Sequence, residues 1–223
     1  NRFFNLAWQT YADDWIRGVW DNFETAPPIL RLPENWRESE LTRAKGQIVG
    51  FIRFRKTLLH QMPETETERA GAWPSRRSWY EFALPLLTAC MAVQAGEDLE
   101  RLCLGGSVGE GAAIEFFAWR TEADLPSTET IMEWLKKPSL MKLPERGDRQ
   151  YAILGAVVAE AMRDVPKYWK PVSDLLKSEP KALDIAAVVA SPLAHWFAAH
   201  PTEVDPKELN WVAPLWESVA GVD

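Results

Sequence analysis

Apolar residues along this chain recur at intervals of three and four, the spacing that gathers side chains on one face of an α-helix. In the segment 12–23, Trp15, Val19, Trp20 and Phe23 follow this spacing. The same pattern predicts further helices over residues 36–60, 76–95, 97–103, 112–121, 128–137, 144–164, 165–177, 181–199 and 206–222. No useful stretch alternates apolar and polar positions as a strand would, and no fixed-period repeat is present. We therefore expect a mainly α fold, built as a helical bundle.

Residues that start or stop helices divide these segments. Asn35, Ser75 and Ser127 are predicted N-caps, because their side chains can accept hydrogen bonds from the first free backbone N–H groups of a helix. Glu38 stands three residues after Asn35, where a capping box places its acid. Pro85 lies inside a predicted helix and lacks an N–H, so it predicts a kink or break.

Three stretches are predicted to lie outside regular helices. Residues 62–71 are rich in threonine and glutamate and are expected to form a loop. Residues 105–111 contain four glycines and are expected to interrupt a helix. A phosphate-binding role for these glycines would need a lysine and a preceding strand, so we favour helix termination and close packing. Residues 124–144 contain three prolines and are the candidate linker between two helical sub-bundles.

Composition indicates a globular protein and excludes some functions. Of 223 residues, 47% are hydrophobic and 26% are charged, and the twelve tryptophans favour dense packing. A net charge of -7 argues against nucleic-acid binding through phosphate neutralisation. The longest apolar region, residues 182–199, is interrupted by polar residues and a proline, so no membrane association is expected.

The cysteines and histidines do not form a recognisable metal site. Cys90 and Cys103 are the only two cysteines, and both lie in apolar stretches, which predicts reduced thiols in a cytoplasmic protein. The opening residues lack the basic and apolar regions of a signal peptide. His60, His195 and His200 lack the spacing of paired ligands on one helix face, so no bound metal is expected.

The most informative motif is an arginine pair at the start of a predicted helix. The segment 73–79 reads Trp-Pro-Ser-Arg-Arg-Ser-Trp. A helix N-terminus already carries partial positive charge, so an arginine such as Arg77 in the first turn is locally unfavourable unless it meets an anion such as phosphate. Two alternatives stay open from residue chemistry alone, an ion pair with Glu81 and stacking on Trp73 or Trp79.

Two motifs resemble those of MoxR-like AAA+ ATPases. Residues 74–79 resemble the W-P-S-P-R-S-W stretch that begins a lid-domain helix in that family. The resemblance implies that Arg77 is the sensor 2 residue near the γ-phosphate of ATP. Arg76, which replaces the family's proline, is the second residue expected at the nucleotide. The opening Asn1-Arg2-Phe3 is similar to the family's N-R-F or D-R-F, so Arg2 matches the catalytic arginine finger that points toward a neighbouring subunit's ATP.

The resemblance covers about residues 1–120 and implies a division of the chain. Residues 1–10 would end the AAA+ core, residues 11–123 would form a lid-like helical domain, and residues 124–223 would form a C-terminal helical extension. No G-x-x-x-x-G-K-[ST] loop is present. We therefore expect the C-terminal part of a longer ATPase, inactive alone, with ATP and magnesium bound only by the full-length protein.

The resemblance also implies partners. Members of the family resemble ring-forming chaperones that remodel a client, often a protein with a von Willebrand factor A domain, so self-association and a protein client are expected. The alternative is a non-enzymatic helical interaction module that binds a partner through tryptophan-rich grooves. In that case Arg76 and Arg77 would be surface or stacking residues.

Overall fold

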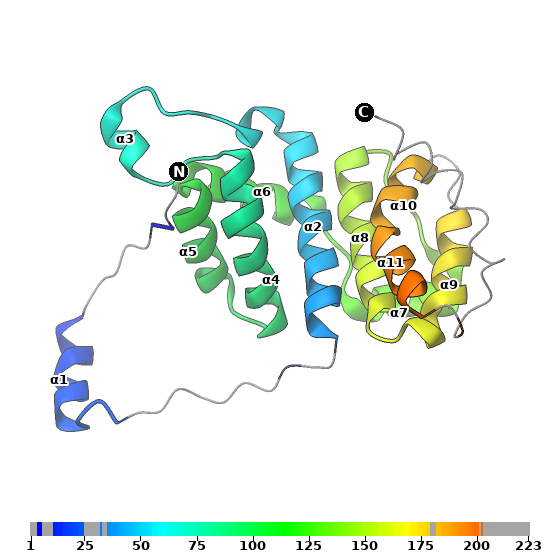
Figure 1. The fold of residues 1–223 in the computed structure, drawn as a ribbon, viewed down its shortest axis with the longest axis horizontal. Coiled ribbons are helices and arrows are strands. Elements are labelled where there is room, and N and C mark those ends of the chain that lie inside the picture. Colours follow the sequence, from blue (N-terminus) through cyan, green and yellow to red (C-terminus); the bar gives the residue numbers. More distant parts are fainter. Residues whose placement is uncertain are drawn as a thin grey trace.

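The computed structural model describes residues 4–5, 11–24, 32, 35–178, 182–200 and 202. These residues form helices, turns and irregular segments with no strand among them, which confirms the mainly α prediction (Figure 1). The elements in chain order are α1 (Ala12–Trp20), α2 (Trp36–Phe54), η1 (Lys56–Leu59), α3 (Glu66–Ala70), η2 (Ser78–Ala83), α4 (Leu84–Ala92), α5 (Glu97–Val108), α6 (Glu110–Ala123), α7 (Thr128–Lys136), η3 (Pro138–Leu140), α8 (Gly147–Met162), α9 (Val165–Lys177), α10 (Leu183–Val189) and α11 (Ser191–Ala199).

The helices surround two hydrophobic cores. The first core lies among α2, η2, α4, α5 and α6 and is rich in aromatic rings, with Phe51 and Phe116 meeting edge to face at 5.3 Å between centroids. The second core lies among α7 to α11 and is mainly aliphatic, with Leu154 and Leu175 fully buried. We call the helices around the first core the first bundle and those around the second core the second bundle. Figure 1 shows the two bundles side by side, with α2 and α8 in the middle. The proposed division of the chain at residue 124 stays a prediction.

Glycines bring α2 and α8 into backbone contact at the centre of the molecule. A Cβ added to Gly46 would lie 2.9 Å from the Tyr151 carbonyl oxygen, and one added to Gly155 would lie 2.9 Å from the Gly46 Cα. A Cβ on Gly50 would lie 2.5 Å from the carbonyl oxygen of Asp148. Side chains are excluded from these positions, so the two helices pack more closely than helices separated by side chains.

Several helix boundaries agree with the sequence prediction. Helix α9 spans the predicted residues 165–177, and its last turn ends at Lys177. The Ser127 side chain accepts a hydrogen bond from the Thr130 N–H at 3.3 Å, which confirms this N-cap. The predicted helix over 206–222 lies outside the described residues.

Other details of the helix ends differ from the prediction. Helix α2 begins at Trp36 as predicted, but Asn35 before it is left-handed, with φ of 59°, and its side chain makes no cap hydrogen bond. The predicted loop 62–71 contains the short helix α3. Thr65 and Glu68 form a reciprocal capping box at its N-terminus. The predicted helix 181–199 divides into α10 and α11 near Pro192, because proline supplies no N–H to continue the helical hydrogen bonds.

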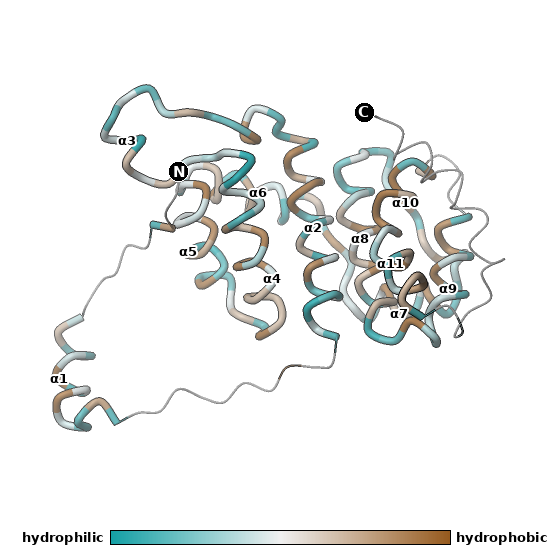
Figure 2. The backbone as a smooth tube through the Cα atoms, in the orientation of Figure 1, coloured by the Kyte–Doolittle hydropathy of each residue, from teal (hydrophilic) through white to brown (hydrophobic). Residues whose placement is uncertain are grey.

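Helix α1 differs from the other long helices because none of its residues is buried. Trp15 is 63% exposed and Trp20 is 82% exposed, although both lie on the predicted apolar face. Figure 2 shows apolar stretches gathered within the two bundles, whereas α1 carries apolar and polar residues together at a distance from them. Among the described residues, no helix has both the length and the apolar character to cross a bilayer.

Candidate functional site

The arginine motif begins a helix whose first turn is fixed by two serines. The Ser75 N–H donates to the Ser78 Oγ at 2.8 Å, and the Ser78 N–H donates to the Ser75 Oγ at 3.0 Å. This is the reciprocal arrangement of a capping box, with serine at the third helical position instead of glutamate or glutamine. The predicted N-cap at Ser75 is therefore confirmed, and the backbone direction at Arg76 and Arg77 is defined.

Two tryptophans of the motif pack against aromatic residues of the neighbouring segments. The Trp79 indole N–H donates to the Leu58 carbonyl at 2.7 Å, and its ring lies 5.6 Å from that of Phe51. Trp73 instead meets His60 edge to face at 5.6 Å between centroids. Because Trp79 is only 3% exposed, it is part of the first core rather than a surface on which Arg77 stacks.

Arg76 and Arg77 are exposed, and their side chains are unpaired within the described part of the chain. Neither guanidinium forms a hydrogen bond, ion pair or ring contact with another described residue. The sequence left two alternatives for Arg77, an ion pair with Glu81 and stacking on a tryptophan ring. Neither contact forms among the residues that the structure describes. Two cations remain next to the positive end of a helix, where an anion is favoured.

The helix widens immediately after the arginines. Residues 78–83 form the π-helical turn η2, and the Leu84 N–H donates to the Trp79 carbonyl, five residues earlier. Pro85 offers no N–H, and in an α-helix its ring would press on the carbonyl of Glu81, so the wider turn accommodates the proline. The kink or break predicted at Pro85 takes the form of a change in helix type, because the π-helical η2 ends at Ala83 and the α-helical α4 begins at Leu84, directly before the proline. Single π-helical turns often occur at functional sites.

The glycine segment lies against the chain that leads into the motif. Gly109 has φ of 88°, and a Cβ there would lie 2.7 Å from the Ala72 carbonyl oxygen. At Gly106 a Cβ would lie 2.4 Å from the Asn5 carbonyl oxygen, and the Asn5 N–H donates to the Gly106 carbonyl at 2.9 Å. Gly105 and Gly106 are inside α5, so the predicted interruption is confined to Gly109. These glycines permit close packing of two other chain segments.

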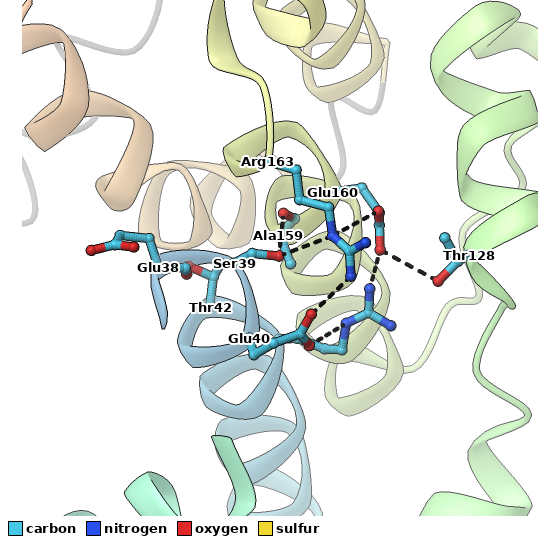
Figure 3. A network of polar contacts seen from close by, with 9 residues as sticks. Glu38, Ser39, Glu40, Thr42, Thr128, Ala159, Glu160 and Arg163 are labelled. Carbon is cyan, nitrogen blue, oxygen red and sulfur yellow. Dashed lines mark hydrogen bonds and ion pairs between the residues drawn. The ribbon is translucent and has the colours of Figure 1, made fainter. Parts of the chain in front are cut away.

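A polar cluster, apart from the arginine motif, joins the two bundles where α2 meets α8 and α7 (Figure 3). Glu160 is 2% exposed, and its carboxylate pairs with the Arg43 guanidinium. Arg163 bridges Glu160 at 3.3 Å and Glu40 at 2.8 Å. The Ser39 hydroxyl donates to the Ala159 carbonyl at 2.9 Å. Each buried charge here meets an opposite charge, as a buried ionic network requires.

This cluster borders a polar cleft of about 540 Å³ between the bundles. Gln47 lines the cleft, and its buried Oε1 has no hydrogen-bond partner among the described residues. The cleft arginines Arg43, Arg120 and Arg163 are all paired with glutamates. Because no arginine in the cleft remains free, we assign the cluster a structural role.

The cluster was not predicted from the sequence. Arg43 and Glu160 are 117 positions apart, so their pairing has no local signal. The available hint was Glu160 itself, a carboxylate within the apolar stretch 152–162. An acidic residue at such a position has to find a partner when the helix is buried.

The structure places only part of the predicted nucleotide site. Arg76 and Arg77 lie together on one exposed turn, whereas Arg2 lies outside the described residues. Within the described ranges, no three His, Cys, Asp or Glu side chains are grouped to hold a metal ion. The structure therefore defines the surroundings of Arg77 but not its relation to Arg2.

We compared the chain and its fold with known proteins. No family model, curated protein or solved structure matches it. The sequence motifs and the geometry around Arg77 are therefore the features that bear on function.

Proposed function

We propose that this chain is the lid and C-terminal helical extension of a MoxR-like AAA+ ATPase, with Arg77 as its sensor 2 residue. The observation that supports this proposal most directly is the exposed guanidinium of Arg77, which lies on a capped first helical turn without a side-chain partner among the described residues. Arg76 contributes a second positive charge on the same turn.

The chemistry of phosphoryl transfer explains why such an arginine is useful. Negative charge spreads over the γ-phosphate oxygens in the transition state, and cations positioned in advance stabilise it. The guanidinium presents a planar fork of N–H donors that fits two phosphate oxygens. An unpaired Arg77 on a rigid turn keeps these donors available without first breaking an internal ion pair.

The remaining parts of the ATPase belong to an upstream core. We propose that this core binds ATP and magnesium, and that Arg2 acts as a finger on the ATP of a neighbouring subunit. This arrangement couples hydrolysis to assembly of a ring. The helices beyond residue 123 would contact other subunits or a client protein, for which a von Willebrand factor A domain protein is the candidate.

The first experiment is to read the coding sequence upstream of Asn1. A G-x-x-x-x-G-K-[ST] loop and an acidic strand end within about 150–200 residues, one domain's length, would support the proposal. A start codon at or just before Asn1 would contradict it.

The second experiment tests the site in the longer protein. We expect Arg77→Ala to lower kcat for ATP hydrolysis by about tenfold to a hundredfold, with an unchanged thermal midpoint, because it removes one cation and its N–H donors from the transition state. The matched control is Lys170→Ala, which removes an exposed cation from α9 in the other bundle. Unchanged turnover in Arg77→Ala would exclude the sensor role.

A second candidate function is supported by α1. The exposed Trp15 and Trp20 of α1, together with the exposed Phe23 in the turn after it, offer apolar surface of the kind that protein partners bury. Under this alternative the chain is a helical interaction module without ATPase activity. It predicts no nucleotide-binding core in the same gene, so the upstream sequence distinguishes the two functions.

A further inference from the structure

The two cysteines of the chain lie next to each other in the first bundle. Cys90 is near the end of α4 and Cys103 is in α5, and their Sγ atoms are 3.8 Å apart. The short connection between these helices turns at Gln94, which has φ of 52°. The helical hairpin therefore brings together two thiols that are 13 positions apart in the sequence.

We propose that Cys90 and Cys103 form an oxidation site, at which a peroxide converts the two thiols into a disulfide within the chain. The sulfur atoms would have to approach from 3.8 Å to about 2.05 Å, the length of a disulfide bond. Side-chain rotation and a small shift of the hairpin supply this movement. The site is independent of ATP binding and does not rest on the function proposed above.

The two thiols differ in their access to solvent, and this difference sets the order of events. Cys90 is only 5% exposed, whereas Cys103 is partly exposed. Burial and then the neighbouring Cys103 raise the pKa of Cys90 to about 12, so Cys90 stays protonated at neutral pH. Because Cys103 is the more exposed of the two sulfurs, it is the one that a peroxide reaches first.

The reaction has two steps. The Cys103 thiolate attacks one oxygen of hydrogen peroxide, the O–O bond breaks, and Cys103 becomes a sulfenic acid while hydroxide leaves and takes up a proton to form water. The Cys90 thiol then gives up its proton as its sulfur attacks the Cys103 sulfur, so the S–S bond forms, the S–O bond of the sulfenic acid breaks, and the departing hydroxide takes that proton and leaves as a second water. Two thiols are oxidised, and one peroxide is reduced to two waters.

Oxidation fits this pair better than metal binding does. In the part of the chain that the structure describes, no third His, Cys, Asp or Glu is grouped with the two sulfurs. Structural zinc sites usually have four protein ligands, so two thiols alone are a poor site. A disulfide needs only the two sulfurs and room for them to approach.

The test uses the reduced chain as it is. Hydrogen peroxide is added, remaining thiols are blocked with an alkylating reagent, and the intact mass and linked peptides are measured. We expect a loss of two hydrogens, no alkylation at Cys90 or Cys103, and full reversal by dithiothreitol. Because the chain has only two cysteines, any intramolecular disulfide must join this pair. The thermal midpoint should rise by several degrees, because the cross-link restricts the unfolded chain.

Two single variants test the assigned order. In Cys90→Ser, we expect a sulfenic acid at Cys103 that dimedone traps, because the second sulfur is missing. In Cys103→Ser, we expect Cys90 to react at least tenfold more slowly than Cys103 does in the other variant. Circular dichroism confirms that each variant is folded, and urea should abolish the difference in rate because it removes the burial of Cys90.

Three results would overturn the proposal. The first is a folded wild-type protein that keeps both thiols under excess peroxide. The second is addition of oxygen atoms at Cys103 without a disulfide. The third is formation only of disulfides between chains, which a non-reducing gel would show as dimers.

Discussion

Helices α1 and α9 show what an amphipathic pattern does and does not determine. Both carry apolar residues on one face and polar residues on the other. Helix α9 buries that face against α7, α8 and α10, and its buried apolar residues are Val165, Trp169, Val172, Leu175 and Leu176. Helix α1 buries none of its residues. The pattern therefore predicts a helix that needs an apolar partner, without identifying the partner.

The local chain explains the difference. Helix α8 ends at Met162 and α9 begins at Val165, so the short turn between them forces the two helices to pack as neighbours. The Asp164 carboxylate fixes that turn by accepting a hydrogen bond from the Lys167 N–H at 3.3 Å. In the described part of the chain, no two-residue turn of this kind joins α1 to another helix, and its N-cap residue Tyr11 makes no side-chain cap hydrogen bond.

The largest expected effect separates the tryptophans of these two helices. We expect Trp169→Ala to lower the free energy of unfolding by about 3–5 kcal/mol, because it leaves a cavity in the second core. The matched change Trp20→Ala in α1 should cost less than about 0.5 kcal/mol. Urea unfolding followed by circular dichroism measures both. A cost above about 1 kcal/mol for Trp20→Ala would show that α1 packs on the bundles in solution.

Charged residues should show the same contrast. Glu160→Ala leaves the two arginines Arg43 and Arg163 to share the Glu40 carboxylate, and we expect a loss of about 3 kcal/mol in unfolding free energy. In α1, Asp14 pairs with Arg17 at 3.3 Å, but both side chains are mostly exposed. Asp14→Ala should therefore change the unfolding free energy by less than about 0.5 kcal/mol. Equal effects of the two substitutions in urea unfolding would contradict this contrast.

Glycine substitutions should have opposite signs in the two regions. Gly46→Ala would place a Cβ against the backbone of α8, and we expect it to cost about 1–3 kcal/mol in unfolding free energy. Gly18→Ala in α1 would meet only the exposed ring of Phe23, which can rotate away. Alanine also favours a helix over glycine by about 1 kcal/mol, so the helical content of α1 should increase. Thermal unfolding and far-ultraviolet circular dichroism distinguish the two outcomes.

The sequence predicted what local chemistry decides. The caps at Ser75 and Ser127 were found because the hydrogen bonds involved span three residues. The same cap predicted that Arg77 lies in the first helical turn, whereas its exposure and lack of a partner among the described residues are seen only in the structure. The continuation of α5 through Gly106 was missed, because this glycine packs against Phe4 and Asn5, about a hundred positions away in the sequence.

The polar cluster between the bundles was missed for the same reason. The contact between Ser39 and Ala159 joins residues 120 positions apart, so it appears only when α2 and α8 are packed together. The close approach of Gly46 and Gly155 likewise cannot be predicted from either helix alone, because each glycine is needed only where the backbone of the other helix lies against it. Local sequence signals predicted the helices and the turn that carries the two arginines. The contacts between α2 and α8 could be found only from the tertiary structure.

The smallest expected effect concerns a carboxylate at the start of α8. Asp148 accepts hydrogen bonds from the Trp119 indole at 2.8 Å and from the Arg146 guanidinium at 2.9 Å. Burial acts to raise the pKa of Asp148, but these two donors outweigh it and hold the pKa below its ordinary value of 3.8. A lowered pKa in the folded state means that the carboxylate stabilises the fold above about pH 4 and loses this effect as the pH falls further.

We therefore expect Asp148→Asn to cost about 1 kcal/mol in unfolding free energy at pH 7, and less as the pH falls below 4. Urea unfolding at a series of pH values measures the difference between wild type and variant. The control is Asp14→Asn in α1, for which the cost in unfolding free energy should not vary with pH. Helix α1 has no buried residues, so the charge of an exposed carboxylate there contributes little to stability. A constant cost of Asp148→Asn across the series would mean that the carboxylate acts through shape alone. A pH-dependent cost in Asp14→Asn would mean that α1 has a partner in solution.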